Sequence, residues 1–390
     1  MSTANSIEII KSEIMNQRWK KIENEMELLD LDVVLIYGKG IITQYGNLYY
    51  FGGYYPILRH GFVIKMKGQE PIAYYNTRAD YFLAKEKGTI KDVRYVGTGD
   101  VIQAEDPLLV EIANVINASS PKRVSIVGLK ENMNIKQYEY LMNHIKGEIV
   151  DGTAMLAKIK SYKSQEEIEM VKNSFTLAEK SYAAFKEVIE PGKTCSEIAG
   201  EIEKIARGNG AIDTLVFIEE GPFFLRKPTK KVISENALVT CYVELIDENG
   251  YWVEKGGLIA VGNISKEMKE LADACVQAME EVKKTIKPGK TVGDIADAIN
   301  SHIKHLDVNI GIWHGHGVGV DHDLPVIYDN GKEVIEEGMV LSVHPNFANA
   351  TEEFGASIAD VFIVTKDGAE SLSKLPYLTY LSQKESERIG

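Results

Sequence analysis

Long apolar runs, paired cysteines and an excess of basic residues are all missing from this sequence. No stretch approaches the roughly 18 to 20 apolar residues that a membrane helix needs, so we expect no membrane partner. Cys195, Cys241 and Cys275 form neither a paired framework nor a metal-type spacing, and we expect reduced packing residues. The net charge of −13 disfavours a nucleic-acid partner, because phosphate binding rests on clustered Lys and Arg. A small-molecule or protein partner fits better.

What the sequence does have is the composition of a globular protein, with 44% hydrophobic and 26% charged residues. A chain of 390 residues is too long for one compact hydrophobic core, which predicts two domains. Residues 1–30 are typical of an amphipathic helix with Glu and Lys throughout, not of a secretory signal. We therefore expect a cytoplasmic protein.

Two patterns of apolar residues divide the chain. Short β-rich runs at 33–37, 61–66, 93–96 and 124–128 alternate with helical patterns, which predicts an α/β domain over residues 1–157. From Ser164 a long charged helix begins, and we place a second domain over residues 158–390.

The second domain contains an internal repeat. The turn Pro-Gly-Lys-Thr ending at Thr194 returns 97 residues later, ending at Thr291. Each copy stops a helix and starts another, with Thr as N-cap and an acidic residue three positions on. The glycine that a phosphate-binding loop requires is absent, since Glu187 and Lys284 stand in its place. The repeat therefore predicts two similar α/β halves with a cleft between them.

Histidine is concentrated in one region. His314, His316, His322 and His344 lie within 31 residues, and three of them fall in WHGHGVGVDHDLP. A single histidine in such a run is most simply a core or turn residue. A cluster spaced by glycines instead favours function, because imidazole titrates near neutral pH and binds metals.

The run GHGVGVDHDLP resembles the glycine-histidine motif of the creatinase and Xaa-Pro dipeptidase family (peptidase M24). The similarity extends over roughly residues 10 to 380. It includes GNLYYFGGY in the first domain, and IEPGKT, VELIDENGYWVEKGGLIAVG, EEGMVLSVHPNF and GASIADVFIVT in the second. The resemblance implies a creatinase-like α/β N-terminal domain followed by a pita-bread catalytic domain, an α/β (α+β) fold. It also implies a homodimer.

The resemblance also implies where metal ligands would lie. A family peptidase holds two cations with two aspartates, one histidine and two glutamates. His316 retains the histidine, while Glu254 stands for the second aspartate, His344 for the third acidic ligand and Ala359 for the last.

The first aspartate falls at Tyr242 or Glu244, since the register of that strand is open. Two cations bring about four positive charges, and the lost carboxylates would leave these uncompensated. We therefore expect no metal and no cofactor.

Two basic residues extend the expected site. Arg59 occupies the place of an N-terminal-domain arginine that, in creatinase, reaches the partner subunit's cleft and holds the substrate carboxylate. The hairpin GPFFLRKPTKK offers Arg226 and Lys227 where the family carries a histidine.

These features lead to a first hypothesis of a metal-independent, creatinase-like enzyme. It would hydrolyse a C–N bond of a small polar substrate, an amide or guanidino compound bearing a carboxylate, by acid-base catalysis. The catalytic residues would be His316, His344, Glu254 and Glu244. The substrate would contact His322, Arg59, Arg226, His314 and Tyr242.

Three alternatives stay open. The first is an Xaa-Pro dipeptidase or aminopeptidase type of metallohydrolase, with one Zn or Fe ion on His316, His344 and a glutamate. The second is a lyase acting on a small substrate. The third is a non-catalytic binding protein of the same fold, against which the retained cluster of ionisable side chains counts.

Overall fold

The computed structural model describes residues 3–39, 46–54, 56, 59–97, 106–223 and 225–381. It divides into two compact units, Met1–Lys160 and Ser161–Gly390. Among the described residues, no helix is both long and apolar enough to cross a membrane.

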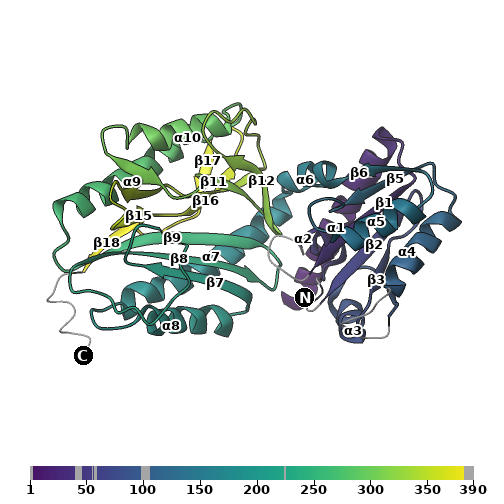
Figure 1. Cartoon of the computed structure of the whole chain (residues 1–390), viewed down its shortest axis with the longest axis horizontal. Coiled ribbons are helices and arrows are strands. Elements are labelled where there is room, and N and C mark those ends of the chain that lie inside the picture. Colours follow the sequence, from purple (N-terminus) through teal and green to yellow (C-terminus); the bar gives the residue numbers. More distant parts are fainter. Residues whose placement is uncertain are drawn as a thin grey trace. The chain divides into compact units, whose positions relative to one another are not determined.

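The first unit alternates helices and strands, as its sequence predicts (Figure 1). Its helices are α1 (Thr3–Leu28), α2 (Gly46–Gly52), α3 (Arg78–Lys87), α4 (Pro107–Ala118), α5 (Ile135–His144) and α6 (Thr153–Ser161). Its strands are β1 (Val33–Lys39), β2 (His60–Met66), β3 (Ile72–Tyr75), β4 (Asp92–Tyr95), β5 (Arg123–Val127) and β6 (Glu148–Asp151).

These strands form one mixed sheet in the order β4-β3-β2-β1-β5-β6. The strand β2 runs antiparallel to both β1 and β3, whereas β5 runs parallel to β1. Strand β1 is buried along almost its whole length, which accounts for its continuous apolar run. Apolar side chains of α4, including Leu108 and Ile112, share one core with this sheet.

Four helices of the second unit carry the repeated turn. They are α7 (Gln165–Val188), α8 (Cys195–Gly208), α9 (Lys266–Thr285) and α10 (Val292–Ser301). The N-cap hydroxyls of Thr194 and Thr291 accept hydrogen bonds from the backbone N–H of Glu197 and Asp294, and both caps are full capping boxes. The helix starts predicted from the repeat are therefore confirmed.

The strands of the second unit form three sheets, ordered β18-β9-β8-β7, β12-β11-β13-β16-β17 and β10-β14-β15. Their bounds are β7 (Ala211–Glu219), β8 (Ala237–Asp247), β9 (Trp252–Val261), β10 (Val308–Ile310), β11 (Gly315–Val318), β12 (His322–Ile327), β13 (Val340–Val343), β14 (Asn346–Asn349), β15 (Gly355–Ser357), β16 (Asp360–Val364), β17 (Ala369–Ser371) and β18 (Leu378–Leu381).

The two halves of this unit meet at their sheets. Helices α7 and α8 contact β7, β8 and β9, whereas α9 and α10 contact β12, β14 and β15, on the other side of the unit in Figure 1. Gly256 of β9 bridges to Ala359, next to β16, by two backbone hydrogen bonds. The side chains that could bind a metal ion or take part in catalysis lie around this junction.

Candidate metal centre

The pairing of β8 with β9 places one carboxylate opposite another. Glu244 lies directly opposite Glu254, and Tyr242 lies opposite Gly256. Residues paired in this way point to the same face of a sheet. Of the two candidates for the first ligand position, Glu244 is therefore the one that faces Glu254.

His316 completes a tight contact with this carboxylate pair. Its Nε2 lies 2.9 Å from Glu254 Oε1, and its Nδ1 lies 2.9 Å from the carbonyl oxygen of Gly317. The hydroxyl of Ser342, on the neighbouring strand β13, donates to Glu254 Oε2 over 2.9 Å. Both oxygens of Glu254 are thus held from β11 and β13.

Two further imidazoles approach the same point. The ring centroid of His322 lies 4.4 Å from that of His316, and the centroid of His344 lies 5.6 Å from it. His322 Nε2 is 3.9 Å from Glu254 Oε1. His344 and Glu254 are buried, whereas the His322 side chain keeps 29% of its surface exposed. His322 is therefore the imidazole of this trio that opens most to solvent.

Burial and charge divide the protonation states of the cluster. Burial alone would lower the pKa of His316, but Glu254 outweighs it and raises that pKa to about 9. Burial lowers the pKa of His344 to about 3, and burial with the charge of His316 lowers that of His322 to about 4. The pKa of Glu244 is raised well above its usual value by burial and then by Glu254. His322 and His344 are thus neutral near pH 7, which is the form in which an imidazole nitrogen binds a metal.

This cluster contains a donor set suited to one metal ion. The ligand atoms of Glu254, His316 and His344 all lie within 4.8 Å of one another. Two imidazole nitrogens and one carboxylate oxygen form a set that binds Zn or Fe and leaves positions open. A second group, Glu244, Glu254 and His322, overlaps it through Glu254.

The place of the last family carboxylate is closed by an aromatic ring. Ala359 is fully buried and packs in a cluster with Tyr242 and Phe217. The Tyr242 hydroxyl lies 2.6 Å from the Ser357 hydroxyl and donates to the carbonyl oxygen of Ile358 over 2.8 Å. The donors present therefore fit one ion, because the side chains of Tyr242 and Phe217 fill the space beside Ala359.

The other expected site residues lie around the cluster or apart from it. His314 is buried beside it, with Nε2 3.7 Å from Asp329, and burial lowers its pKa. Arg226 Nε pairs with Glu219 Oε2 at 2.6 Å instead of joining the histidines. Arg59 belongs to the first unit, where it is half-buried. Residues 55, 57 and 58, just before it in the chain, lie outside the described residues.

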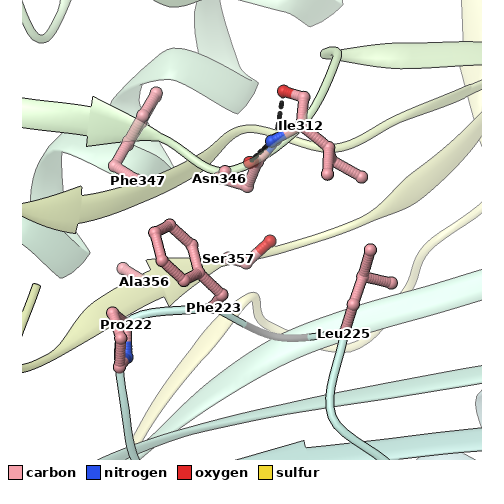
Figure 2. A pocket seen from close by; sticks show the side chains of 9 residues that line it. Pro222, Phe223, Leu225, Ile312, Asn346, Phe347, Ala356 and Ser357 are labelled. Atoms are coloured by element: carbon pink, nitrogen blue, oxygen red, sulfur yellow. Dashed lines mark hydrogen bonds between the residues drawn. The ribbon is translucent and has the colours of Figure 1, made fainter.

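A small apolar cavity of about 110 Å³ adjoins the cluster (Figure 2). Phe223 and Leu225 from the hairpin line one side, and Ile312, Asn346 and Ser357 line the other. It is linked to the cluster on two sides. Asn346 donates to the carbonyl oxygen of His344 over 2.8 Å, and Ser357 contacts the Tyr242 hydroxyl.

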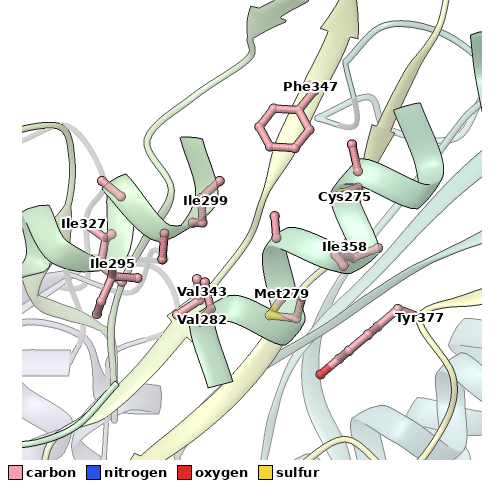
Figure 3. Packing of buried hydrophobic residues seen from close by; sticks show 14 of the residues in the cluster. Cys275, Met279, Val282, Ile295, Ile299, Ile327, Val343, Phe347, Ile358 and Tyr377 are labelled. Atoms are coloured by element: carbon pink, nitrogen blue, oxygen red, sulfur yellow. The ribbon is translucent and has the colours of Figure 1, made fainter. Parts of the chain in front are cut away.

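A hydrophobic core supports the strands that carry the imidazoles. Met279 and Val282 of α9 share this core with Ile327 and Val343, which lie on β12 and β13 (Figure 3). Val343 directly precedes His344, and the N–H of His314 donates to the carbonyl oxygen of Ile327. Packing behind the sheet therefore fixes the backbone on which the histidines are placed.

Several functional neighbours were missed by sequence reasoning. Ser342 could have been found, because it lies two residues before His344 and side chains two apart in a strand share a face. Asn346, Ser357 and the cavity carry no local signal, since they come together only in the folded unit.

The fold and this cluster define a hydrolase architecture with a metal-type centre, and comparison with known proteins places it in a family. Residues 169–366 match the model of Metallopeptidase family M24, and residues 18–161 match the Creatinase/Prolidase N-terminal domain. The chain belongs to metallopeptidase family M24. It is a hydrolase acting on C–N bonds, as the sequence predicted.

Individual relatives span nearly the whole chain. The Xaa-Pro dipeptidase of Pyrococcus furiosus is 25% identical over 369 residues, covering 92% of this chain and 98% of that protein. The prolidase structure from Pyrococcus horikoshii has a TM-score of 0.77 at 23% identity and covers 92% of this chain and 99% of its own. An Xaa-Pro dipeptidase structure from Bacillus anthracis has a TM-score of 0.79 at 20% identity, covering 94% and 100%. These structures confirm the predicted pita-bread fold.

The expectation of no metal and no cofactor is wrong. The chain belongs to a metallopeptidase family, its relatives are Xaa-Pro dipeptidases, and Glu254, His316 and His344 form a candidate ion-binding group. The expectation rested on the lost carboxylates alone, whereas His344 offers a neutral nitrogen where one of them is lost. Of the hypotheses drawn from the sequence, the metallohydrolase alternative fits these findings better than the metal-independent one.

Proposed function

We propose that this protein is a metallohydrolase of small peptides, similar to Xaa-Pro dipeptidases, with a centre for a single ion. The observation that carries the proposal is the convergence of Glu254, His316 and His344, whose ligand atoms lie within 4.8 Å of one another. Relatives over more than nine-tenths of the chain are named Xaa-Pro dipeptidase, which supports a dipeptide substrate. The apolar cavity beside the cluster supports a substrate with one apolar side chain.

The chain's own residues divide the remaining work. A bound Zn or Fe ion would supply Lewis-acid chemistry at the peptide carbonyl. His322 is the most open of the imidazoles close to Glu254, so it is placed to contact the substrate. Burial and the charge of Glu254 raise the pKa of Glu244 and so favour its protonated form, which could donate a proton toward the leaving nitrogen. His314 and Tyr242 would shape the site around the substrate.

The test combines ion content with activity. We expect the purified protein to hold one equivalent of Zn or Fe by elemental analysis, and to hydrolyse dipeptides, including those with a C-terminal proline. Chelation should abolish turnover, and adding back Zn²⁺ or Fe²⁺ should restore it. His316→Ala and His344→Ala should each lose the ion and at least about 100-fold in turnover. His305→Ala, an exposed histidine outside the cluster, is the matched control and should behave like the parent.

Two results would overturn this proposal. Turnover that survives complete removal of bound metal would exclude an ion-dependent reaction. Two equivalents of metal per chain, both lost in His344→Ala, would exclude the single-ion centre.

A further inference from the structure

A buried ion pair joins the β11–β12 hairpin, which carries His316 and His322, to the segment before α7. Lys163 Nζ is 3.0 Å from Asp323 Oδ2, and the two side chains are only 3% and 1% exposed. Lys163 Nζ also donates to the carbonyl oxygen of Ser161 over 3.4 Å. A side chain at Gly319 would collide with both partners, since its Cβ would lie 2.3 Å from Asp323 Oδ2 and 3.0 Å from Lys163 Cε.

The β11–β12 hairpin is irregular next to this ion pair. Val318 pairs with His322 and Gly317 with Asp323, but His316 pairs with Val326. Two residues of β12 are therefore left out of the ladder between Asp323 and Val326. The segment before α7 contacts this bulge at two adjacent residues, because Ser161 Oγ donates to the carbonyl oxygen of Leu324 over 3.1 Å while Lys163 binds Asp323.

The register of β12 on the turn side of this bulge decides which way His322 points. Adjacent residues of a strand face opposite sides, so Asp323 turns toward Lys163 while His322 turns toward Glu254. A slip of one residue would exchange the two faces and remove the imidazole from the cluster. A charge that is paired in a dry interior resists such a slip, because the slip would leave Lys163 buried without its partner.

We propose that the Lys163–Asp323 pair is a positioning device that fixes the register of the β11–β12 hairpin and thereby aims His322 at the substrate. Its catalytic consequence rests on the function proposed above. Neither Lys163 nor Asp323 belongs to the candidate ion-binding groups, and the pair acts through His322.

The test uses full-length protein and does not begin with activity. We expect Lys163→Met with Asp323→Asn, a double variant that buries no charge, to fold and to keep one equivalent of Zn²⁺. In histidine-labelled protein, the imidazole NMR signals of His322 should shift while those of His305 stay unchanged. Dipeptide turnover (kcat) should fall roughly 100-fold, with KM changed much less, as for a misplaced catalytic group. Lys163→Arg with Asp323 unchanged keeps a cation opposite the carboxylate, so it should retain most of the parental turnover.

Lys172→Met is the matched control. Lys172 lies on α7 and pairs with Glu370 at 3.0 Å, but on the surface, so its loss should leave the His322 signals and turnover unchanged. A folded double variant with parental His322 signals and parental kcat would overturn the positioning role. Loss of bound Zn²⁺ together with turnover would also overturn it, because the pair would then only hold the fold. If the parent itself binds no metal and cleaves no dipeptide, the proposed function fails, while the NMR measurement still decides the role of the pair.

Discussion

Tyr242 and Ala359 together account for the single ion in the proposed centre. The Tyr242 ring packs against Ala359 and Phe217, and its hydroxyl is held by Ser357 and Ile358. A carboxylate at position 359 and an aromatic ring at position 242 would compete for the same space. The two residues are therefore best understood as a matched pair.

This pairing predicts that restoring one carboxylate cannot restore a second ion. In Ala359→Glu, an ionised carboxylate would enter a fully buried apolar cluster without a cation to compensate it. We expect a loss of about 3 kcal/mol or more in the free energy of unfolding, and no gain in bound metal. Urea unfolding and elemental analysis measure both.

The control for that change is Ala350→Glu, because Ala350 is exposed on the turn after β14 and should accept the charge within about 0.5 kcal/mol. An Ala359→Glu variant that is as stable as the parent and binds two ions would contradict the pairing.

At the scale of elements, the sequence identifies what local chemistry determines. The N-caps at Thr194 and Thr291 follow from one turn motif, and the structure has both capping boxes. The bulge between Gly317 and His316 could not be predicted, because it is a matter of strand pairing, and the Lys163–Asp323 pair next to it joins residues 160 apart in the chain. The approach of His344 to Glu254 is likewise set by sheet pairing and not by spacing along the chain.

The start of α4 offers a test of pH dependence away from the centre. Asp106 caps the helix by accepting a hydrogen bond from Leu108 N, and its other oxygen lies 3.1 Å from His60 Nε2. Burial would raise the pKa of Asp106, but His60 and the helix N–H outweigh it and lower that pKa below its usual 3.8. The stabilisation is therefore complete above about pH 3.8 and is lost as pH falls through the lower, folded-state pKa.

Two substitutions separate the cap from the charge. Asp106→Ala should lower the free energy of unfolding by about 1 kcal/mol at neutral pH, because it removes both the cap and the charge. Asp106→Asn keeps the capping oxygen and should lose only the stabilisation that comes from the charge. Amide hydrogen exchange in α4 and the urea midpoint should both report the difference. The difference in the free energy of unfolding between the parent and Asp106→Asn should decrease as pH falls below 3.8. A difference in stability that grows as the pH falls would contradict the lowered pKa of Asp106.

At the scale of the whole molecule, the resemblance of motifs predicted the fold and family, while the chemistry of the centre needed coordinates. The motif GHGVGVDHDLP and its neighbouring segments identify the family, because glycines and turns that shape a backbone are recognisable in sequence. The number of ions is a different question. It depends on whether Glu244 or Tyr242 faces Glu254 and on what fills the space near Ala359, and both are properties of strand register.

The last prediction concerns assembly. Arg59 is half-buried in the first unit, so part of its side chain stays open to a ligand. A guanidinium fork pairs well with a carboxylate, and the family resemblance places the substrate carboxylate in the cleft of a partner subunit. We therefore propose a homodimer in which Arg59 binds substrate across the interface. The parent should sediment as a dimer at micromolar concentration.

Arg59→Ala should remain a dimer and show KM raised by about 10-fold or more for dipeptides, with kcat changed much less, because a charge-assisted hydrogen bond to the substrate carboxylate is lost. Arg59→Lys should recover little, since an ammonium cannot form the paired contacts of a guanidinium. Arg78→Ala is the control in the same unit, because Arg78 stacks on Tyr95 with its guanidinium carbon 4.9 Å from the ring centroid. A parent protein that sediments only as a monomer while cleaving dipeptides would show that Arg59 serves no partner's site.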